Sequence, residues 1–214
     1  STPICAVLWD FGGVITTSPF EAFRRYEAER GLPADTIRTI NSTSPDTNAW
    51  ARFERNEITA AEFDVAFADE ARRRGHDIRG FDVLQLLSGD VRPEMVEAIG
   101  RVARAGLKTA CLTNNVVHPS QTYADRRSGD VTAVMDLFDA VIESSKVGCR
   151  KPEQRFYDIA CHAIGVPAAQ CVFLDDLGIN LKPAAAMGMT TIKVVSAHQA
   201  LLELESVLAI PLLS

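Results

Sequence analysis

Residues 5–19 decide how this chain folds, and they read C-A-V-L-W-D-F-G-G-V-I-T-T-S-P. A short apolar run ends at a single carboxylate, Asp10, and two glycines, Gly12 and Gly13, follow after Phe11. A continuous apolar run of this length is typical of a strand that is buried on both faces of a parallel sheet. Glycine permits close approach of the backbone to a ligand and dihedral angles that other residues avoid. The stretch therefore predicts a buried strand that places one acidic group at its own end, followed by a sharp turn.

The rest of the chain alternates between apolar runs and helical patterns. We expect four more buried strands, at Thr109–Leu112, Ala140–Ile142, Cys171–Leu174 and Thr190–Val195. Helices are expected over Pro93–Ala105, closed by Gly106, and over Pro152–Ile164, opened by proline in its first turn and closed by Gly165. This alternation indicates an α/β fold with a doubly wound, Rossmann-like parallel sheet.

One long segment breaks this alternation. Residues 16–90 read almost entirely as helix and loop, and Thr59 and Glu62 form a plausible capping box at the start of one of the helices. The economical account is a second, helical subdomain inserted after the first strand. We therefore expect an α/β core made of residues 1–15 and 91–214, with residues 16–90 as the insertion.

Composition excludes several classes of protein. The chain has 214 residues, of which 47% are hydrophobic and 23% charged, with a net charge of −6 and a pI near 5.3. An acidic chain without a basic stripe is unsuited to binding nucleic acid, and no apolar run approaches the ~18 residues of a membrane helix. Five cysteines, an odd number with no C-x-x-C, fit reduced thiols, and no signal-peptide layout opens the sequence. We expect a cytoplasmic globular protein with no nucleic-acid or membrane partner; the sequence contains no signature of its oligomeric state.

Polar side chains that could act on a ligand gather where the predicted strands stop or just before a helix. In an open parallel sheet, ligands bind at the carboxyl ends of the strands. The candidates are Asp10, Thr113, Asn114, Lys151, Asp175 and Asp176. Each of them alone is more simply a turn, cap or surface residue, but together they indicate a site.

The charges of these candidates indicate a metal and a phosphate. The carboxylates of Asp10, Asp175 and Asp176 would repel one another at one edge of the sheet. A divalent cation and one lysine, Lys151, would balance them. Mg²⁺ fits because it prefers a few carboxylate oxygens and keeps waters that a phosphate oxygen can replace. We therefore predict Mg²⁺ as the cofactor and a small phosphorylated molecule as the substrate.

Four motifs give the chain a resemblance to a known family. They are D-F-G-G-V at Asp10, L-T-N at Thr113, R-K-P at Lys151 and L-D-D at Asp175–Asp176. In order and setting they resemble the motifs of the haloacid dehalogenase-like hydrolases, and the long insertion resembles the helical cap of that family. The segments K-V-G-C-R-K-P-E-Q-R-F-Y and V-F-L-D-D-L-G-I-N-L-K-P-A are most similar to the phosphatase-type domain at the N-terminus of soluble epoxide hydrolases.

The resemblance implies a role for each catalytic candidate. Asp10 would be the nucleophile that attacks phosphorus and forms an aspartyl-phosphate, which water then hydrolyses. Thr113 would hydrogen-bond the transferring phosphoryl group, and Asn114 would help to orient it. Lys151 would neutralise charge on the nucleophile and the phosphate. Lys146 is a weaker candidate for the lysine role because no proline follows it.

The resemblance also implies the metal ligands. Asp175 and Asp176 would hold Mg²⁺ directly or through water, together with Asp10. In this family the backbone carbonyl two residues after the nucleophile is also a ligand, and that residue here is Gly12.

Gly12 departs from the commonest pattern of the family. Many members have a second aspartate at this position, which protonates the leaving group and later activates water. The loss of a general acid typically costs about 10² to 10⁴ in rate, and less for a good leaving group. Thr17 and His118 are the nearest substitutes by sequence. The departure leaves three hypotheses open: a modest phosphatase or one restricted to good leaving groups, a 2-haloacid dehalogenase-like hydrolase, and a non-catalytic phosphate-binding module.

One cysteine has charged neighbours. Cys149 is followed by Arg150 and Lys151. Adjacent positive charge favours the thiolate, so the sequence predicts a lowered pKa for Cys149 and a thiol that is open to oxidation.

Overall fold

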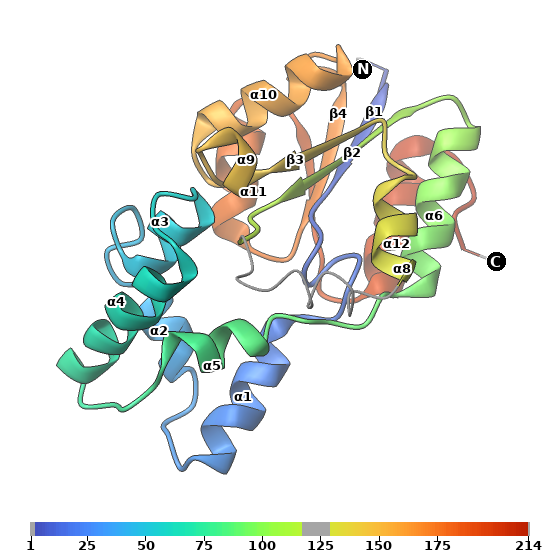
Figure 1. The fold of residues 1–214 in the computed structure, drawn as a ribbon. Helices are drawn as coiled ribbons and strands as arrows, with labels where there is room; N and C mark the ends of the chain where they lie inside the picture. The colour runs from blue at the N-terminus through green and yellow to red at the C-terminus, as the bar shows by residue number, and fades with distance from the viewer. Residues whose placement is uncertain (1–2, 117–128, 214) are drawn as a thin grey trace.

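The central sheet has five parallel strands. A computed structural model describes residues 3–116 and 129–213 (Figure 1). The strands are β1 (Ala6–Trp9), β2 (Lys108–Thr113), β3 (Ala140–Glu143), β4 (Cys171–Asp175) and β5 (Thr190–Lys193). Their spatial order is β3-β2-β1-β4-β5, and all neighbouring pairs are parallel. The predicted doubly wound α/β fold is confirmed.

Strand β1 lies in the middle of the sheet and sets the position of Asp10. All four of its residues are buried, which explains its uninterrupted apolar sequence. Trp9 pairs with Cys111 of β2 on one side and with Leu174 of β4 on the other. The ends of the three central strands therefore lie side by side, and the amide of Asp10 donates to the carbonyl of Leu174 at 2.9 Å.

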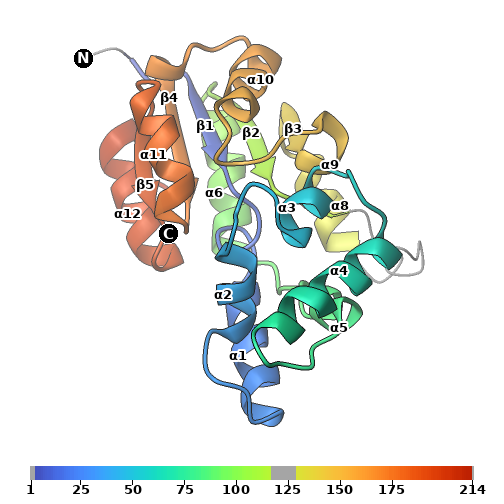
Figure 2. The same ribbon diagram turned by 90° about the vertical axis from the view of Figure 1, so that its left-hand side faces the viewer.

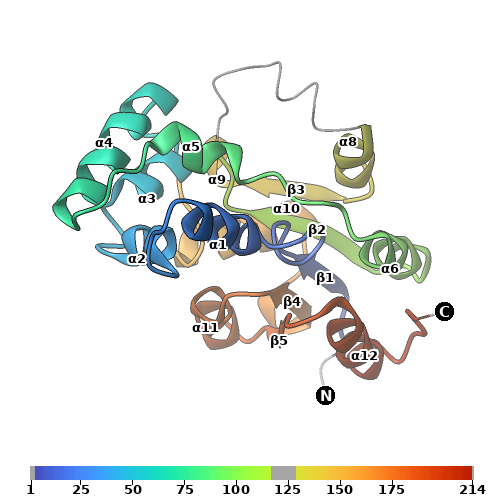
Figure 3. The ribbon, with the colours of Figure 1, turned by 90° about the horizontal axis from the view of Figure 1, so that it is seen from below.

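Helices cover both faces of the sheet (Figures 1 and 3). One face carries α6 (Pro93–Arg104), α8 (Gly129–Met135) and α12 (Ala197–Leu208), and the other carries α9 (Ser144–Val147), α10 (Gln154–Ile164) and α11 (Gly178–Ala186), with a short 3₁₀ turn η1 (Ala168–Gln170) before β4. Because side chains of a strand alternate between faces, Val7 and Trp9 pack in the α6–α12 cluster, while Ala6 and Leu8 pack in the α10–α11 cluster.

The inserted segment is helical and has a hydrophobic core of its own. Its helices are α1 (Pro19–Glu29), α2 (Thr36–Ser42), α3 (Ala49–Glu54), α4 (Ala60–Arg73) and α5 (Gly80–Gln85). They lie together beyond the carboxyl ends of the strands (Figure 2). Phe53, Phe63 and Phe67 are fully buried among them. The predicted capping box of Thr59 and Glu62 at the start of α4 is confirmed. We refer to residues 16–90 as the cap; this boundary stays a prediction.

The two segments that connect the cap to the core run side by side. Thr16 forms an antiparallel bridge with Val91, and the amide of Thr17 donates to the carbonyl of Asp90 at 2.9 Å. A Cβ added at Gly89 would lie 2.6 Å from the carbonyl oxygen of Thr17. Glycine is therefore required at position 89, where the two connecting segments approach each other.

Two predicted boundaries were wrong. Helix α10 begins at Gln154 with Glu153 as its N-cap, so Pro152 precedes the helix instead of standing in its first turn; the Lys151–Pro152 peptide bond is cis and belongs to the preceding turn. Strand β5 ends at Lys193 and not at Val195, because the amides of Val195 and Ser196 donate to the side chain of Gln199 in the cap of α12.

No helix in the described ranges combines the length and the apolar character that crossing a membrane requires.

Candidate active site

Lys151 lies at the centre of the site and contacts two of the carboxylates. Its Nζ donates to Asp10 Oδ1 at 2.7 Å and to Asp175 Oδ2 at 2.8 Å, and only 1% of the residue is exposed. Burial alone would lower the pKa of Lys151, but the charges of Asp10 and Asp175 outweigh it and raise the pKa above its usual range. The lysine is therefore a fixed positive charge between the nucleophile candidate and the end of β4.

The three predicted carboxylates do come together. One oxygen from each of Asp10, Asp175 and Asp176 lies within 4.8 Å of the others. Burial and the charge of Asp175 raise the pKa of Asp10 to about 8, and the same two causes raise the pKa of Asp176 to about 6. Clustered carboxylates disfavour one another's ionised forms, and a cation between them would reverse this. The all-oxygen donor set and its spacing fit a hard divalent ion such as Mg²⁺.

Of the two glycines after Asp10, only Gly13 is required by sterics. It has a φ of 88°, and a Cβ at this position would lie 2.8 Å from Asp176 Cγ and closer still to its Oδ2. At Gly12 the nearest atom to an added Cβ is Pro19 Cδ, at an ordinary contact distance of 3.9 Å. The loop therefore needs glycine to let Asp176 approach, whereas the side chain at position 12 is missing although there is room for one.

The hydroxyl and the amide at the end of β2 have different surroundings. Thr113 is 7% exposed, and within the described residues its hydroxyl forms no hydrogen bond, which leaves it available to a ligand. Asn114 is fully engaged: its Nδ2 donates to the Lys151 carbonyl at 3.0 Å and its Oδ1 accepts from the Lys151 amide at 2.9 Å. This geometry fits a residue that holds Lys151 in place better than one that reaches a phosphoryl group.

The sequence model of one family matches most of the chain. That family is the haloacid dehalogenase-like hydrolases, and residues 4–188 match it. The chain belongs to this family. The predicted resemblance is thereby confirmed.

One relative of this hydrolase is a phosphatase by name, and two others are longer proteins that match this chain over part of their length. It is 30% identical to phosphatase MT3486 of Mycobacterium tuberculosis, over 87% of this chain and 85% of that protein. It is also 35% identical to mouse acyl-CoA dehydrogenase family member 10 over 97% of the chain, and 31% identical to mouse bifunctional epoxide hydrolase 2 over 93% of the chain. The chain spans 19% and 38% of the length of these last two proteins.

Solved structures of the family share the fold. A family enzyme from Bacteroides thetaiotaomicron in complex with magnesium and inorganic phosphate superposes with a TM-score of 0.61 at 18% identity, covering 89% of this chain and 93% of that one. The L-2-haloacid dehalogenase of Xanthobacter autotrophicus with covalently bound chloropropionic acid gives 0.60 at 19% identity, over 97% and 84% of the two chains. At these identities the likeness is one of fold alone, and a shared fold does not by itself indicate a shared reaction.

Sequence reasoning missed the role of Asn180 in the hydrolase site. Its Nδ2 lies 3.2 Å from Oδ1 and 3.1 Å from Oδ2 of Asp175, and its carbonyl accepts from the hydroxyl of Tyr157 at 2.6 Å. The amide of Leu177 also donates to Asp175 Oδ1, at 2.8 Å. Asp175 is thus held in one orientation. The sequence feature that could have indicated this role is an asparagine in the first turn of the helix that follows the L-D-D motif.

A cap residue, Arg38, was also missed. It lies on α2 with its guanidinium carbon 4.6 Å from the centre of the Phe20 ring. Burial is the main cause that raises the pKa of Asp176; the charge of Lys151 opposes it most, and the charge of Arg38 opposes it to a smaller extent. The cap therefore brings a cation toward the carboxylate cluster, which periodicity along α2 could not reveal.

Several secondary candidates lie elsewhere. Lys146 is exposed and forms an ion pair with Glu143, so it does not take the lysine role. The hydroxyl of Thr17 accepts from the Asp90 amide at 3.0 Å in the crossing between cap and core, and His118 lies outside the described residues. The prediction for Cys149 was wrong: burial is the main cause that raises the pKa of its thiol, because the side chain packs into the α10–α11 cluster.

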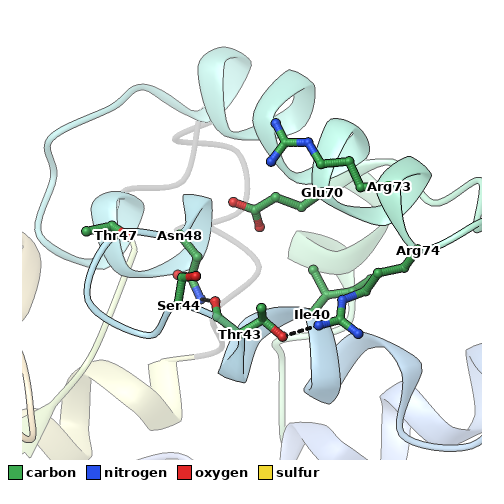
Figure 4. A pocket seen from close by; sticks show the side chains of 8 residues that line it. All are labelled: Ile40, Thr43, Ser44, Thr47, Asn48, Glu70, Arg73 and Arg74. Carbon is green, nitrogen blue, oxygen red and sulfur yellow. Dashed lines mark hydrogen bonds between the residues drawn. The ribbon is translucent and has the colours of Figure 1, made fainter.

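A separate cavity of about 490 Å³ lies within the cap (Figure 4). Its lining residues are Ile40, Thr43, Ser44, Thr47, Asn48, Glu70, Arg73 and Arg74. Arg74 donates to the hydroxyl of Thr43, and Glu70 accepts from the amide of Ala49. These polar groups serve contacts inside the cap, and none of them belongs to the carboxylate cluster.

Proposed function

We propose that this hydrolase is a Mg²⁺-dependent phosphatase that acts on a small phosphorylated metabolite through an aspartyl-phosphate. The observation that supports this most is the placement of Lys151 between Asp10 and Asp175, beside a cluster of three carboxylates within 4.8 Å. A dehalogenase has no need of the Asp175–Asp176 pair, whereas a phosphatase uses it to hold a metal.

The proposed metal ligands are Asp10, Asp175, Asp176 and the carbonyl of Gly12. When bound, Mg²⁺ supplies positive charge and Lewis acidity to the phosphoryl oxygens. Asp176 is the more available of the two carboxylates at the end of β4, because the oxygens of Asp175 already accept from Lys151, Asn180 and Leu177. Asp175 would therefore hold the metal less directly than Asp176, through water, and would also fix Lys151.

The two oxygens of Asp10 have different roles in the proposed reaction. Oδ1 accepts from Lys151 Nζ and from the amide of Phe11, both at 2.7 Å. Oδ2 accepts no hydrogen bond within the described part of the chain, so it is the oxygen available for attack. It forms a bond to phosphorus while the bond from phosphorus to the ester oxygen breaks, and the leaving group takes that electron pair. Thr113 and Lys151 then stabilise the charge on the transferring phosphoryl group.

The missing side chain at Gly12 limits which leaving groups depart easily. No carboxyl group of this loop can protonate the ester oxygen, so it must leave as an anion or take a proton from solvent. A general acid is typically worth about 10² to 10⁴ in rate. We therefore propose that acyl, aryl or anomeric phosphates are better substrates than simple alkyl phosphates.

The second candidate function is that of a 2-haloacid dehalogenase. The same Asp10 would attack carbon instead of phosphorus and release a halide, which needs no proton. The structural likeness to a dehalogenase with bound chloropropionic acid and the absence of a second carboxylate at Gly12 favour it; the Asp175–Asp176 pair disfavours it. A third possibility, a non-catalytic phosphate-binding module, is favoured by Gly12 alone.

The deciding experiment is Mg²⁺-dependent release of phosphate from p-nitrophenyl phosphate and a panel of acyl and alkyl phosphates. Asp10→Asn and a chelator should each abolish turnover, while Asp136→Asn, at an exposed aspartate, should leave it unchanged. No turnover on any phosphate would contradict the phosphatase. Release of chloride from 2-chloropropionate would then identify the dehalogenase.

A further inference from the structure

A buried ion pair crosses from the cap to the core directly beside Lys151. Glu54 is the last residue of α3 in the cap, and Arg150 immediately precedes Lys151 in the core. Arg150 Nε lies 3.0 Å from Glu54 Oε2, and the two side chains are 14% and 5% exposed. Figures 1 and 2 both show α3 against the α9 side of the core. The proposed function assigns no role to this pair.

The pair connects to the main chain of the catalytic lysine. Arg150 Nε also donates to the Lys151 carbonyl, at 3.2 Å, and the side-chain Nδ2 of Asn114 donates to the same oxygen at 3.0 Å. The backbone of Lys151 is thus held from the core by Asn114 and from the cap side by Arg150. Since Lys151 Nζ must reach both Asp10 and Asp175, a shift of this backbone moves the ammonium away from the nucleophile.

Electrostatic attraction holds this pair together, because its hydrogen bonding is incomplete. Glu54 Oε2 and Arg150 Nη1 are buried and have no hydrogen-bond partner among the described residues. Burial is the main cause that raises the pKa of Glu54, and the charges of Arg150 and then Lys151 oppose it. Buried pairs of this kind contribute little net stability, but removing one partner leaves an uncompensated charge. Stability alone is therefore a poor explanation for a glutamate at this position.

A second ion pair crosses the same boundary and provides a matched control. Arg55 Nη1 lies 3.6 Å from Glu153 Oε1, and the side chain of Glu153 is 40% exposed. Arg55 also pairs with Glu57 inside the cap at 2.7 Å. Glu153 Oε1 also accepts from the Arg150 amide at 3.1 Å, which holds without Arg55. In the described part of the chain Arg55 forms no hydrogen bond or ion pair with Lys151, so its loss should loosen the cap slightly without disturbing the lysine.

We propose that Glu54 is a positioning residue, which acts through Arg150 to hold Lys151 against Asp10 when the cap is docked on the core. This inference rests on the proposed function, since it concerns the catalytic lysine of that reaction. It means that the cap takes part in assembling the reacting groups.

The first test measures kcat and KM of Glu54→Gln, Arg150→Gln, the double variant and Arg55→Gln with p-nitrophenyl phosphate. Misplacing a reacting group by about 1 Å can cost about 10²-fold, so we expect kcat of Glu54→Gln to fall by about 10- to 100-fold, with KM changed by less than about twofold. The double variant should be no worse than the poorer single variant, because both remove the same connection. Arg55→Gln should retain kcat within about twofold.

The second test does not depend on turnover. In protein labelled with ¹⁵N-lysine, the buried ammonium of Lys151, assigned with Lys151→Ala, should give a slowly exchanging signal. The signal should weaken in Glu54→Gln and persist in Arg55→Gln. Equal effects of the two variants, a loss confined to KM, or a fall in Tm without a change in this signal would overturn the proposal. If the wild type shows the signal but releases no phosphate, the proposed function fails. The signals of Glu54→Gln and Arg55→Gln then still test the positioning role.

Discussion

Restoring a carboxyl group at position 12 should raise the rate on poor leaving groups. The substitution Gly12→Asp places a Cβ 3.9 Å from Pro19 Cδ, an ordinary contact, and the φ of Gly12 is not in the left-handed region. A Cβ at this position therefore fits without strain. It would stand in the loop directly after Asp10, where it could protonate the leaving group.

The size of the gain follows from the surroundings of Gly12. A positioned general acid is worth about 10² to 10⁴ in rate. Pro19 is the first residue of α1, an eleven-residue helix, and the positive end of a helix dipole stabilises a carboxylate by about 0.3 to 1 kcal/mol. This favours the ionised form and weakens the group as an acid. We therefore expect a gain in kcat/KM near the lower limit, about 10²-fold for alkyl phosphates, and almost none for p-nitrophenyl phosphate.

The assay compares kcat/KM across aryl and alkyl phosphates that span a range of leaving-group pKa. Gly12→Ala fills the same space without an acid and should leave the slope of rate against leaving-group pKa unchanged. Gly13→Ala should abolish activity, because its Cβ would lie 2.8 Å from Asp176 Cγ. If Gly12→Asp gave no gain, or an equal gain for all leaving groups, the reasoning that a missing acid limits this enzyme would be refuted.

Three further outcomes are expected. Lys151→Met should lower kcat/KM by at least about 10²-fold and destabilise the metal-free protein by about 3 kcal/mol, measured by urea unfolding; an unchanged midpoint would contradict the buried pairing. Because the pKa of Asp176 is raised from 3.8 to about 6, the metal-free protein should lose stability as the pH rises through this range, and Asp176→Asn should remove about 3 kcal/mol of that loss at pH 8. A pH-independent difference between the two proteins would refute it. Mg²⁺ should raise Tm more at pH 8 than at pH 5, because bound metal requires ionised carboxylates, and Asp176→Asn should reduce this shift.

The sequence by itself determined the layered fold and that the site lies at the carboxyl ends of the strands. The apolar residues of β1 and β4 are uninterrupted because both faces of these strands are buried, and this property can be read locally. Parallel strands with similar register end together, so polar residues placed directly after them must meet. Asp10, Thr113, Asp175 and Asp176 were predicted on that ground, and Lys151 from the motif that precedes α10.

Only the tertiary structure decided what each of these side chains contacts. Asn114 is turned toward the Lys151 backbone, and Glu54 of the cap lies against Arg150, although 96 residues of sequence separate the latter two. Cys149 has charged neighbours in sequence but packs into an apolar cluster, which reverses the predicted direction of its pKa shift. The physical reason is that burial and side-chain direction depend on how elements distant in sequence pack, and the spacing of residues along one element contains no record of that packing.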